Sequence, residues 1–243
     1  MMSESGIKWE IIDSIGVITL AVQPQNQIHS PDFVDLSTLK SWVDDPSVRG
    51  LVICGEGRHF SSGADLDELR RLSGDYATLR SKMEQGNLVL KYLQNLPIPT
   101  VAAINGACFG AGLEIALACH IRICTGNAMI AFPESSINLI PGLGGTVRLL
   151  RTTGVATALQ MLLNGDPLDA QSALNAGIVS QVIEEKNVSA YSIEYLKKLV
   201  YNKSPQIIKA VVECVNNAIR LPEAEALARE VELFCELALK KFK

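Results

Sequence analysis

The stretch of sequence that decides the fold reads NGACFGAGLE at residues 105–114 and FPESSINLIPGLGGTVR at residues 132–148. Gly106, Gly110 and Gly112 suit a tight turn that opens a helix, because glycine adopts backbone conformations that other residues avoid. Two carboxylates, Glu114 and Glu134, stand in these apolar, glycine-rich segments, where a solvated charge would be out of place. The two segments therefore predict buried acidic groups beside an unusual backbone turn.

The turn before Glu114 predicts a site for negative charge. The first N–H groups of a helix lack partners within the helix and carry partial positive charge, so they can hold an oxygen that becomes anionic during a reaction. Two glutamates beside such a backbone pocket indicate acid/base chemistry at a carbonyl compound. Spacing alone leaves a second interpretation open, in which a glycine-rich packing corner holds a partnered buried glutamate without catalysis.

The overall composition is that of an ordinary globular protein. The chain has 243 residues, of which 48% are hydrophobic and 20% are charged, and its formal net charge is −4. That balance gives no support to nucleic-acid binding. The most apolar stretch, residues 100–124, is interrupted by Asn105, Glu114, His120 and Arg122, and ionisable groups inside a membrane span are costly. We therefore expect a buried core segment there and no membrane partner.

The six cysteines indicate a reducing compartment. They lie in apolar segments at positions 54, 108, 119, 124, 214 and 235, without the CxxC or CxxH spacing of a zinc site. We expect small core residues, with no disulfides and no metal. The first residues lack the basic and apolar regions of a secretory signal. The sequence thus predicts a cytoplasmic protein.

Hydrophobic periodicity predicts strands interleaved with helices. A β-hairpin is expected within residues 7–22, and a helix over residues 31–44 with Ser30 as its N-cap. Asp65 and the acidic residues after it favour the start of another helix. Further strands are expected at residues 50–54, 100–104, 121–125, 128–131 and 178–183, and further helices at 76–96, 113–119, 146–153, 156–163, 169–176 and 222–240. This alternation indicates an α/β core with partly parallel strands over residues 1–190, followed by a helical region over 191–243.

Four motifs, in order along the chain, carry a family resemblance. They are FSSGADL at 60–66, PTVAAING at 99–106 with GAGLE at 110–114, FPE to GGT between 132 and 146, and LNG at 163–165 with Ala170, Ala173 and GIV at 177–179. Together they resemble the signatures of the crotonase (enoyl-CoA hydratase/isomerase) superfamily across nearly the full length of the chain.

The resemblance implies a fold, an assembly and a substrate class. The implied fold is an α/β (α+β) spiral of ββα units, with a helical C-terminal region that mediates assembly into homotrimers and often hexamers. The implied partner is an acyl-CoA or acyl-carrier-protein thioester. Coenzyme A then enters as part of the substrate, and no other cofactor is expected.

The resemblance also assigns the groups that bind the thioester. The backbone N–H groups of Ala64 and Ala111 look like an oxyanion hole for the thioester oxygen. Positions similar to those that receive the CoA and acyl portions are Ser62, Gly63, Ala64, Asp65 and Gly110.

The two glutamates match the catalytic pair of the hydratases, which leaves three functions open. In hydration, Glu114 is expected to activate water and Glu134 to deliver a proton to Cα. Isomerases of this family can work with the glutamate at the position of Glu134 alone, so double-bond isomerisation and thioester decarboxylation remain alternatives. A noncatalytic binding or assembly subunit is the third possibility.

Three histidines and two departures from the family pattern complete the expectations. We interpret His59 as a loop or CoA-edge residue and His120 as a structural replacement for a common aspartate, while His29 ends a segment similar to the family's N-A-L-N. The loop at residues 24–30 lacks the usual basic residue. The sequence as given ends at Lys243, without the segment that caps the CoA site in many hydratases.

Overall fold

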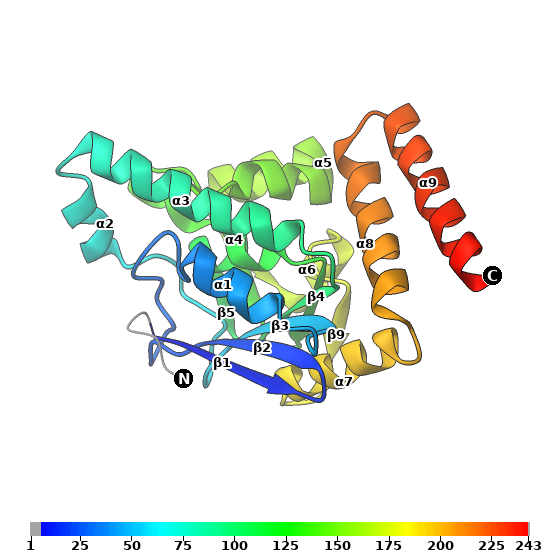
Figure 1. Ribbon diagram of the computed structural model, residues 1–243. Helices are drawn as coiled ribbons and strands as arrows, with labels where there is room; N and C mark the ends of the chain where they lie inside the picture. The colour runs from blue at the N-terminus through cyan, green and yellow to red at the C-terminus, as the bar shows by residue number, and fades with distance from the viewer. Residues whose placement is uncertain (1–5, 243) are drawn as a thin grey trace.

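The structure, a computed structural model, describes residues 6–242 (Figure 1). The expectation about the extreme N-terminus falls largely on residues 1–5, which lie outside the described residues. The centre of the molecule is a six-stranded sheet with strand order β1-β2-β3-β4-β6-β9. Its strands are β1 (Ile7–Ile12), β2 (Ile15–Leu20), β3 (Gly50–Gly55), β4 (Thr100–Ile104), β6 (Ile121–Thr125) and β9 (Gln181–Ile183). The hairpin β1–β2 is antiparallel and the other neighbouring pairs are parallel, which confirms the expected mixed pairing.

A second, three-stranded sheet contains the strand expected at residues 128–131 and two strands that the periodicity did not predict. It consists of β5 (Ala107–Phe109), β7 (Met129–Ala131) and β8 (Leu168–Asp169), in that order. Strands of two or three residues are too short to show a period. β5 follows β4 through Gly106, whose φ of 53° is the left-handed conformation that glycine accepts.

The helices alternate with these strands along the chain. They are α1 (Leu36–Val43), α2 (Leu66–Leu72), α3 (Tyr76–Gln94), α4 (Ala111–Ala118), the 3-10 helix η1 (Pro133–Ile137), α5 (Gly145–Asn164), α6 (Ala170–Asn175), α7 (Val188–Val200), α8 (Pro205–Arg220) and α9 (Glu223–Lys241). The two helices expected at 146–153 and 156–163 form the single element α5, which is kinked at Gly154, where φ is 78°.

The N-terminus of α1 corrects one prediction. The helix was expected to begin after Ser30, but its N-cap is Asp35, whose side chain accepts a hydrogen bond of 2.9 Å from the N–H of Thr38. Phe33 and Val34, which precede it, are buried in the core from an irregular segment. Residues 31–34 therefore bury two apolar side chains in an irregular segment, and the helix begins only after them.

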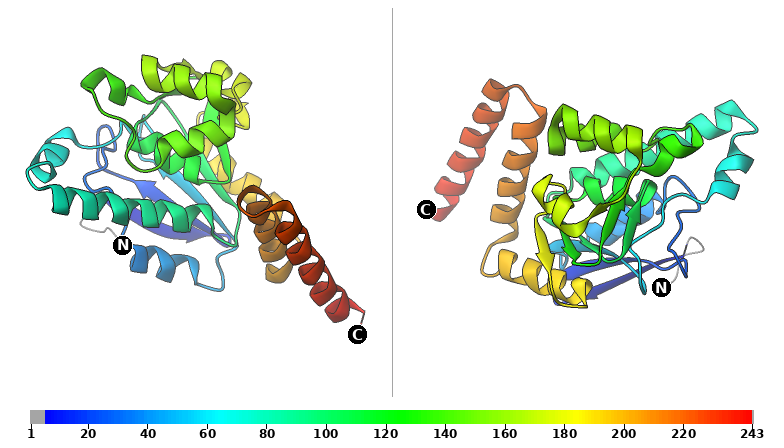
Figure 2. Two further views of the ribbon diagram at one scale, coloured as in Figure 1. Left: turned by 90° about the horizontal axis from the view of Figure 1, so that it is seen from above. Right: turned by 180° about the vertical axis from the view of Figure 1, so that it is seen from behind.

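Two apolar clusters cover the two faces of the main sheet. On one face, α3 and α4 pack over strand residues such as Ile53 and Ile104. On the other face, Ile193 and Leu196 of α7 pack against strand residues that include Val101. Figure 2 shows the sheet between these helical layers.

The cysteine prediction holds for four of the six residues. Cys54, Cys108, Cys119 and Cys124 are buried, as expected for small core residues. The other two are not core residues, because the α8–α9 hairpin on which they lie is exposed: Cys214 is half-buried and Cys235 is exposed.

The hairpin of α8 and α9 extends away from the rest of the protein (Figures 1 and 2). Its exposed apolar side chains include Val211, Val215, Ile219, Leu227, Val231 and Phe234. Within residues 6–242, no helix is both long enough and apolar enough to cross a bilayer.

Candidate active site

One cavity brings together the residues that the sequence singled out. Its volume is about 460 Å³, and it lies among α2, α3, the start of α4, η1 and the loop before α5. Every predicted site residue lines it: Ser62, Gly63, Ala64, Asp65, Gly110, Ala111, Glu114 and Glu134. Much of the remaining wall is apolar, with Leu69, Leu72, Leu79, Met83, Ile137 and Ile140.

Backbone contacts hold the segment before α2 against the start of α4. The N–H of Ser61 donates to the carbonyl of Ala107, and the N–H of Phe109 donates to the carbonyl of Ser61, both at 3.0 Å. Gly63 has a φ of 101°, and a Cβ built there would lie 3.0 Å from the carbonyl oxygen of Phe109 and 3.7 Å from the nitrogen of Ala111. A side chain at this position would therefore separate the two segments.

The backbone amides of Ala64 and Ala111 both border the cavity, and neither has an acceptor among residues 6–242. The Ile28 N–H donates to Gly63 at 2.9 Å and the Asp65 N–H donates to Ile28 at 3.0 Å, so these bonds pass on either side of Ala64. No hydrogen bond is formed by the Ala64 N–H within residues 6–242. The Ala111 N–H is the first of α4 and has no acceptor inside the helix. The arrangement can stabilise negative charge on an oxygen placed between the two amides.

Glu114 is held by a loop that is distant in sequence. Every residue of α4 is buried, and Glu114 itself is 2% exposed. Its Oε1 accepts hydrogen bonds from the N–H groups of Leu143 and Gly145, each at 2.7 Å. Burial raises the pKa of Glu114 to about 7, although the two amide donors oppose the shift. The carboxyl group can therefore exchange a proton near neutral pH.

Glu134 approaches the same cavity from η1. Burial raises the pKa of this carboxyl group as well, and its charge in turn contributes to the raised pKa of Glu114. Its Oε2 is buried and has no hydrogen-bond partner among the described residues. A Cβ built on Gly110 would lie 2.9 Å from Oε1, so the carboxyl group packs directly over the turn that opens α4. Glu134 thus has one oxygen free for a substrate atom.

Comparison with known proteins shows the family to which the chain belongs. The family model described as enoyl-CoA hydratase/isomerase matches residues 10–242. A probable enoyl-CoA hydratase of Bacillus subtilis (strain 168) is 37% identical over 202 residues, which cover 82% of this chain and 77% of that protein. The chain belongs to the enoyl-CoA hydratase/isomerase family.

Two further relatives place the chain within this family. The fatty acid oxidation complex subunit alpha of Shewanella frigidimarina (strain NCIMB 400) is 35% identical over 225 residues, and the match spans 90% of this chain but 31% of that longer protein. A crystal structure of an enoyl-CoA hydratase from Polaromonas sp. JS666 superposes with a TM-score of 0.87 at 25% identity, covering 95% of this chain and 90% of that one. The mixed α/β arrangement is therefore the fold of this hydratase/isomerase family.

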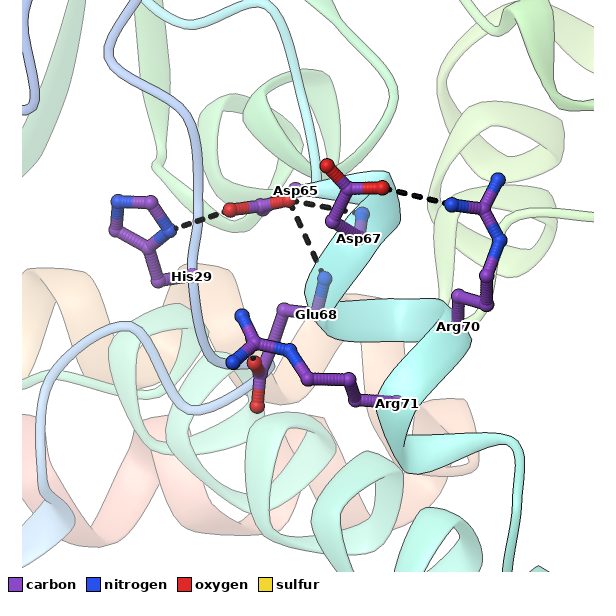
Figure 3. Close-up of polar contacts among 6 residues, drawn as sticks. All are labelled: His29, Asp65, Asp67, Glu68, Arg70 and Arg71. Carbon is purple, nitrogen blue, oxygen red and sulfur yellow. Dashed lines mark hydrogen bonds and ion pairs between the residues drawn. The ribbon is translucent and has the colours of Figure 1, made fainter.

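The Asp65 side chain has a structural role. Its position resembles one of the family's CoA-binding positions. Its Oδ1 accepts from the N–H groups of Asp67 at 2.9 Å and Glu68 at 3.3 Å, which makes it the N-cap of α2 (Figure 3). Its Oδ2 lies 2.8 Å from Nδ1 of His29. The hydrogen bond from Glu68 and then that of His29 hold the pKa of Asp65 below its usual range. The helix that walls the cavity is thereby tied to the loop after β2.

The exposed face of α2 is balanced in charge. Arg70 lies 2.7 Å from Asp67 and Arg71 lies 2.9 Å from Glu68 (Figure 3). Such exposed pairs contribute little to stability.

The other two histidines accept hydrogen bonds from backbone N–H groups. Nδ1 of His59 accepts from the N–H of Ala107 at 3.1 Å, and His59 is not among the described residues that line the cavity. Nδ1 of His120 accepts from the N–H of Thr100 at 3.2 Å and lies 2.9 Å from its hydroxyl oxygen. His120 therefore joins the start of the segment that follows α4 to β4, which is consistent with a structural role.

Sequence reasoning missed the loop that holds Glu114. The motif PGLGGT at 141–146 was recognised only as a family signature. The glycines of this motif indicated an unusual backbone, and Gly144 does have a φ of 88°. The residue types alone do not show which amides point at a carboxylate. Across residues 6–242, no group of three or more His, Cys, Asp or Glu side chains is placed to hold a metal ion.

Proposed function

We propose that the protein is an enoyl-CoA hydratase, which adds water across the double bond of a 2-enoyl thioester. The observation that carries this proposal is the pair of carboxyl groups with raised pKa values, facing one cavity beside the Ala64 and Ala111 amides. Family members named as hydratases support the same reaction. Coenzyme A enters as part of the substrate, and the proposed steps use protein groups alone.

The proposed reaction begins at Glu114. Its ionised carboxylate takes a proton from water while the water oxygen forms a bond to Cβ, and the π electrons move toward the thioester to give an enolate. The enolate oxygen lies between the Ala64 and Ala111 amides, and each such donor lowers the barrier by about 3 kcal/mol. Protonated Glu134 then gives its proton to Cα. A proton passing from Glu114 to Glu134 restores the pair, so the net change is the addition of one water molecule.

The assignment of the two roles follows from the contacts of the two carboxyl groups. Glu114 has one oxygen anchored by two amides, which suits a base that must hold water in one orientation. Glu134 has Oε2 without a described partner, which suits a group that reaches the substrate carbon. Ser62, Gly63, Asp65 and Gly110 are proposed to form the wall against which the thioester lies.

Two alternatives use the same site without hydration. In double-bond isomerisation Glu134 alone shuttles the proton, and in decarboxylation the enolate forms by loss of CO2. A noncatalytic subunit is a third alternative, but leaving carboxyl groups buried without a role is costly.

A product assay separates these functions. Wild type, Glu114→Gln and Glu134→Gln are incubated with 2-enoyl-CoA, 3-enoyl-CoA and malonyl-type thioesters, including carrier-protein forms, and the products are followed by mass. Hydration by wild type should fall by about 10²- to 10⁴-fold in both variants. Isomerisation that survives in Glu114→Gln, or hydration that survives in both variants, would contradict the proposal.

We also propose that the α8–α9 hairpin joins copies of the chain into a trimer, or a hexamer of two trimers. Its row of exposed apolar side chains supports this, because apolar area of this kind is usually covered in an assembly. Light scattering during size exclusion tests it, and a monomer at micromolar concentration would contradict it. The cytoplasmic location expected from the cysteines stays a prediction.

A further inference from the structure

The loop that binds Glu114 accepts hydrogen bonds from two side chains that lie outside the cavity. The loop is taken as residues 141–145, from Pro141 to the first residue of α5, and it donates two N–H groups to Glu114 Oε1. Neither Asn87 of α3 nor Arg148 of α5 is among the described residues that line the cavity. Both nevertheless contact the peptide groups of this loop. Helices α3 and α5 both pack against α4, and both are labelled in Figure 1.

Asn87 fixes the first of the two donating peptide groups. Its Nδ2 donates to the carbonyl oxygen of Gly142 at 3.0 Å and also to that of Met83 at 3.1 Å. The Gly142 carbonyl belongs to the same peptide group as the Leu143 N–H, which donates to Glu114. One peptide plane therefore receives a hydrogen bond on one side and gives one to the carboxylate on the other.

Arg148 fixes the next two peptide groups. Its side-chain Nη1 donates to the carbonyl of Leu143 at 2.6 Å. Its backbone N–H, which does not depend on the side chain, donates to the carbonyl of Gly144 at 3.0 Å. The Gly144 carbonyl belongs to the peptide group whose N–H, on Gly145, donates to Glu114. The guanidinium is also anchored at Nε by Gln94 of α3, at 3.1 Å. Three consecutive peptide groups are thus held in place.

The positive charge of Arg148 also acts on Glu114, in addition to the hydrogen bonds that its side chain makes. Arg148 is 9% exposed, and its cationic group lowers the pKa of Glu114 against the effect of burial. The other charged side chain that acts on Glu114 is Glu134, from η1, which raises that pKa. Glu114 can stay partly ionised near neutral pH because a buried cation and two amides offset its desolvation.

We propose that Arg148 and Asn87 are positioning residues, which act on catalysis by holding the segment whose two amides orient Glu114: Asn87 holds one donating peptide group, and the Arg148 side chain holds the peptide group between the two donors. This inference rests on the proposed role of Glu114 in hydration. Substitution of Arg148 or Asn87 should therefore alter the reactivity of Glu114 without altering how the thioester binds. Because neither side chain faces the cavity, KM should respond little and kcat should respond strongly.

The test compares Arg148→Met, Arg148→Lys and Asn87→Leu with a matched control, Arg151→Met. Arg151 lies one turn further along α5 and is exposed. In Arg148→Met, kcat for crotonyl-CoA should fall by about 10- to 100-fold with KM little changed, as expected when a catalytic group is misplaced by a fraction of an ångström. Asn87→Leu should have a smaller effect of the same kind, and Arg151→Met should match wild type.

A second measurement does not depend on activity. The Glu114 carboxyl group is titrated by infrared difference spectroscopy, with its band assigned by loss in Glu114→Gln. Arg148→Met should titrate at higher pH than wild type, while Arg148→Lys, which keeps the charge, should titrate near wild type and recover part of kcat.

The outcomes separate this inference from the proposed function. Wild type without hydratase activity would contradict the proposed function, and the titration would still decide whether Arg148 and Asn87 set the state of Glu114. A loss of kcat in Arg148→Met with an unchanged Glu114 titration would assign a merely structural role and overturn the inference. If Arg148→Met fails to fold, Asn87→Leu decides: an unchanged kcat in that variant overturns the inference.

Discussion

The two elements that carry the carboxyl groups, α4 and η1, differ in almost every physical respect. All eight residues of α4 are buried, whereas none of the five residues of η1 is. Glu114 on α4 has an oxygen bonded to two amides, and Glu134 on η1 has an oxygen without a described partner. The protein thus fixes one carboxyl group with its core and presents the other from a partly exposed turn. A pair built in this way can hold a water molecule and still reach a carbon atom.

The largest expected effect comes from disturbing the contact between the Glu134 carboxyl group of η1 and the turn that opens α4. Gly110 has a φ of 50°, and a Cβ built there would lie 2.9 Å from Oε1 of Glu134. Gly110→Ala should displace the Glu134 carboxyl group and lower kcat by about 100-fold. The unfavourable backbone conformation should also reduce the free energy of unfolding by about 1–3 kcal/mol. Steady-state kinetics and denaturant unfolding measure the two effects.

Gly126→Ala is the control for this change. A Cβ at Gly126 would have no neighbour within 4 Å, so activity and stability should stay close to wild type. Full activity in Gly110→Ala would mean that Glu134 does not need its observed position over the turn.

The effect of burial on Glu114 of α4 can be tested through the dependence of the free energy of unfolding on pH. The pKa of Glu114 is about 7 in the folded protein, against 4.5 for an ordinary glutamate. Between these values the folded state binds a proton that the unfolded state has released, so the free energy of unfolding falls as pH rises through 7. From pH 5.5 to pH 8.5 this group alone should cost about 2 kcal/mol, and Glu114→Gln should remove that loss.

Urea unfolding at the two pH values measures the difference. Glu185→Gln, which changes an exposed glutamate before α7, should leave the wild-type pH dependence intact. An identical pH dependence in wild type and Glu114→Gln would show that burial does not raise the pKa of Glu114.

The pH dependence of catalysis sharpens the comparison, because it reports both carboxyl groups together. Hydration needs one proton on the pair: with no proton there is no acid for Cα, and with two protons there is no base for water. Since burial raises both pKa values, kcat/KM should follow a bell displaced upward from pH 4.5, with one limb near pH 7. Beyond each limb the rate should change about tenfold per pH unit, and the apparent pKa values belong to the pair. A flat profile from pH 5 to pH 9 would contradict this.

The same contrast explains what could be predicted from the sequence. β4 and β6 were expected at the residues where they occur, because each is a short, mostly apolar run with clear limits. Glu114 and Glu134 were found because an acid in apolar surroundings stands out. β5 and β8 were missed because their pairing is non-local and they are too short to show a period.

The contacts that orient Glu114 could not be predicted for a related reason. The amides that bind it come from positions 29 and 31 residues later in the chain, and an N–H group is present at every residue except proline. Only packing decides which amide faces a carboxylate. Arg148 likewise reads in the sequence as an ordinary helical arginine, although the fold buries it behind the loop.

The smallest expected effect concerns α2. This helix has no buried residue and depends on its N-cap. In contrast, the N-cap of α4 is Gly110, which makes no side-chain hydrogen bond. Asp65→Ala removes the acceptor for two amides and the contact with His29, so α2 should lose about 1 kcal/mol of local stability. Asp65→Asn, which keeps an acceptor, should lose less. Hydrogen exchange of the α2 amides should quicken in Asp65→Ala while that of α4 stays unchanged. Equal protection of α2 in wild type and Asp65→Ala would mean that its packing over the cavity, and not its cap, holds the helix in place.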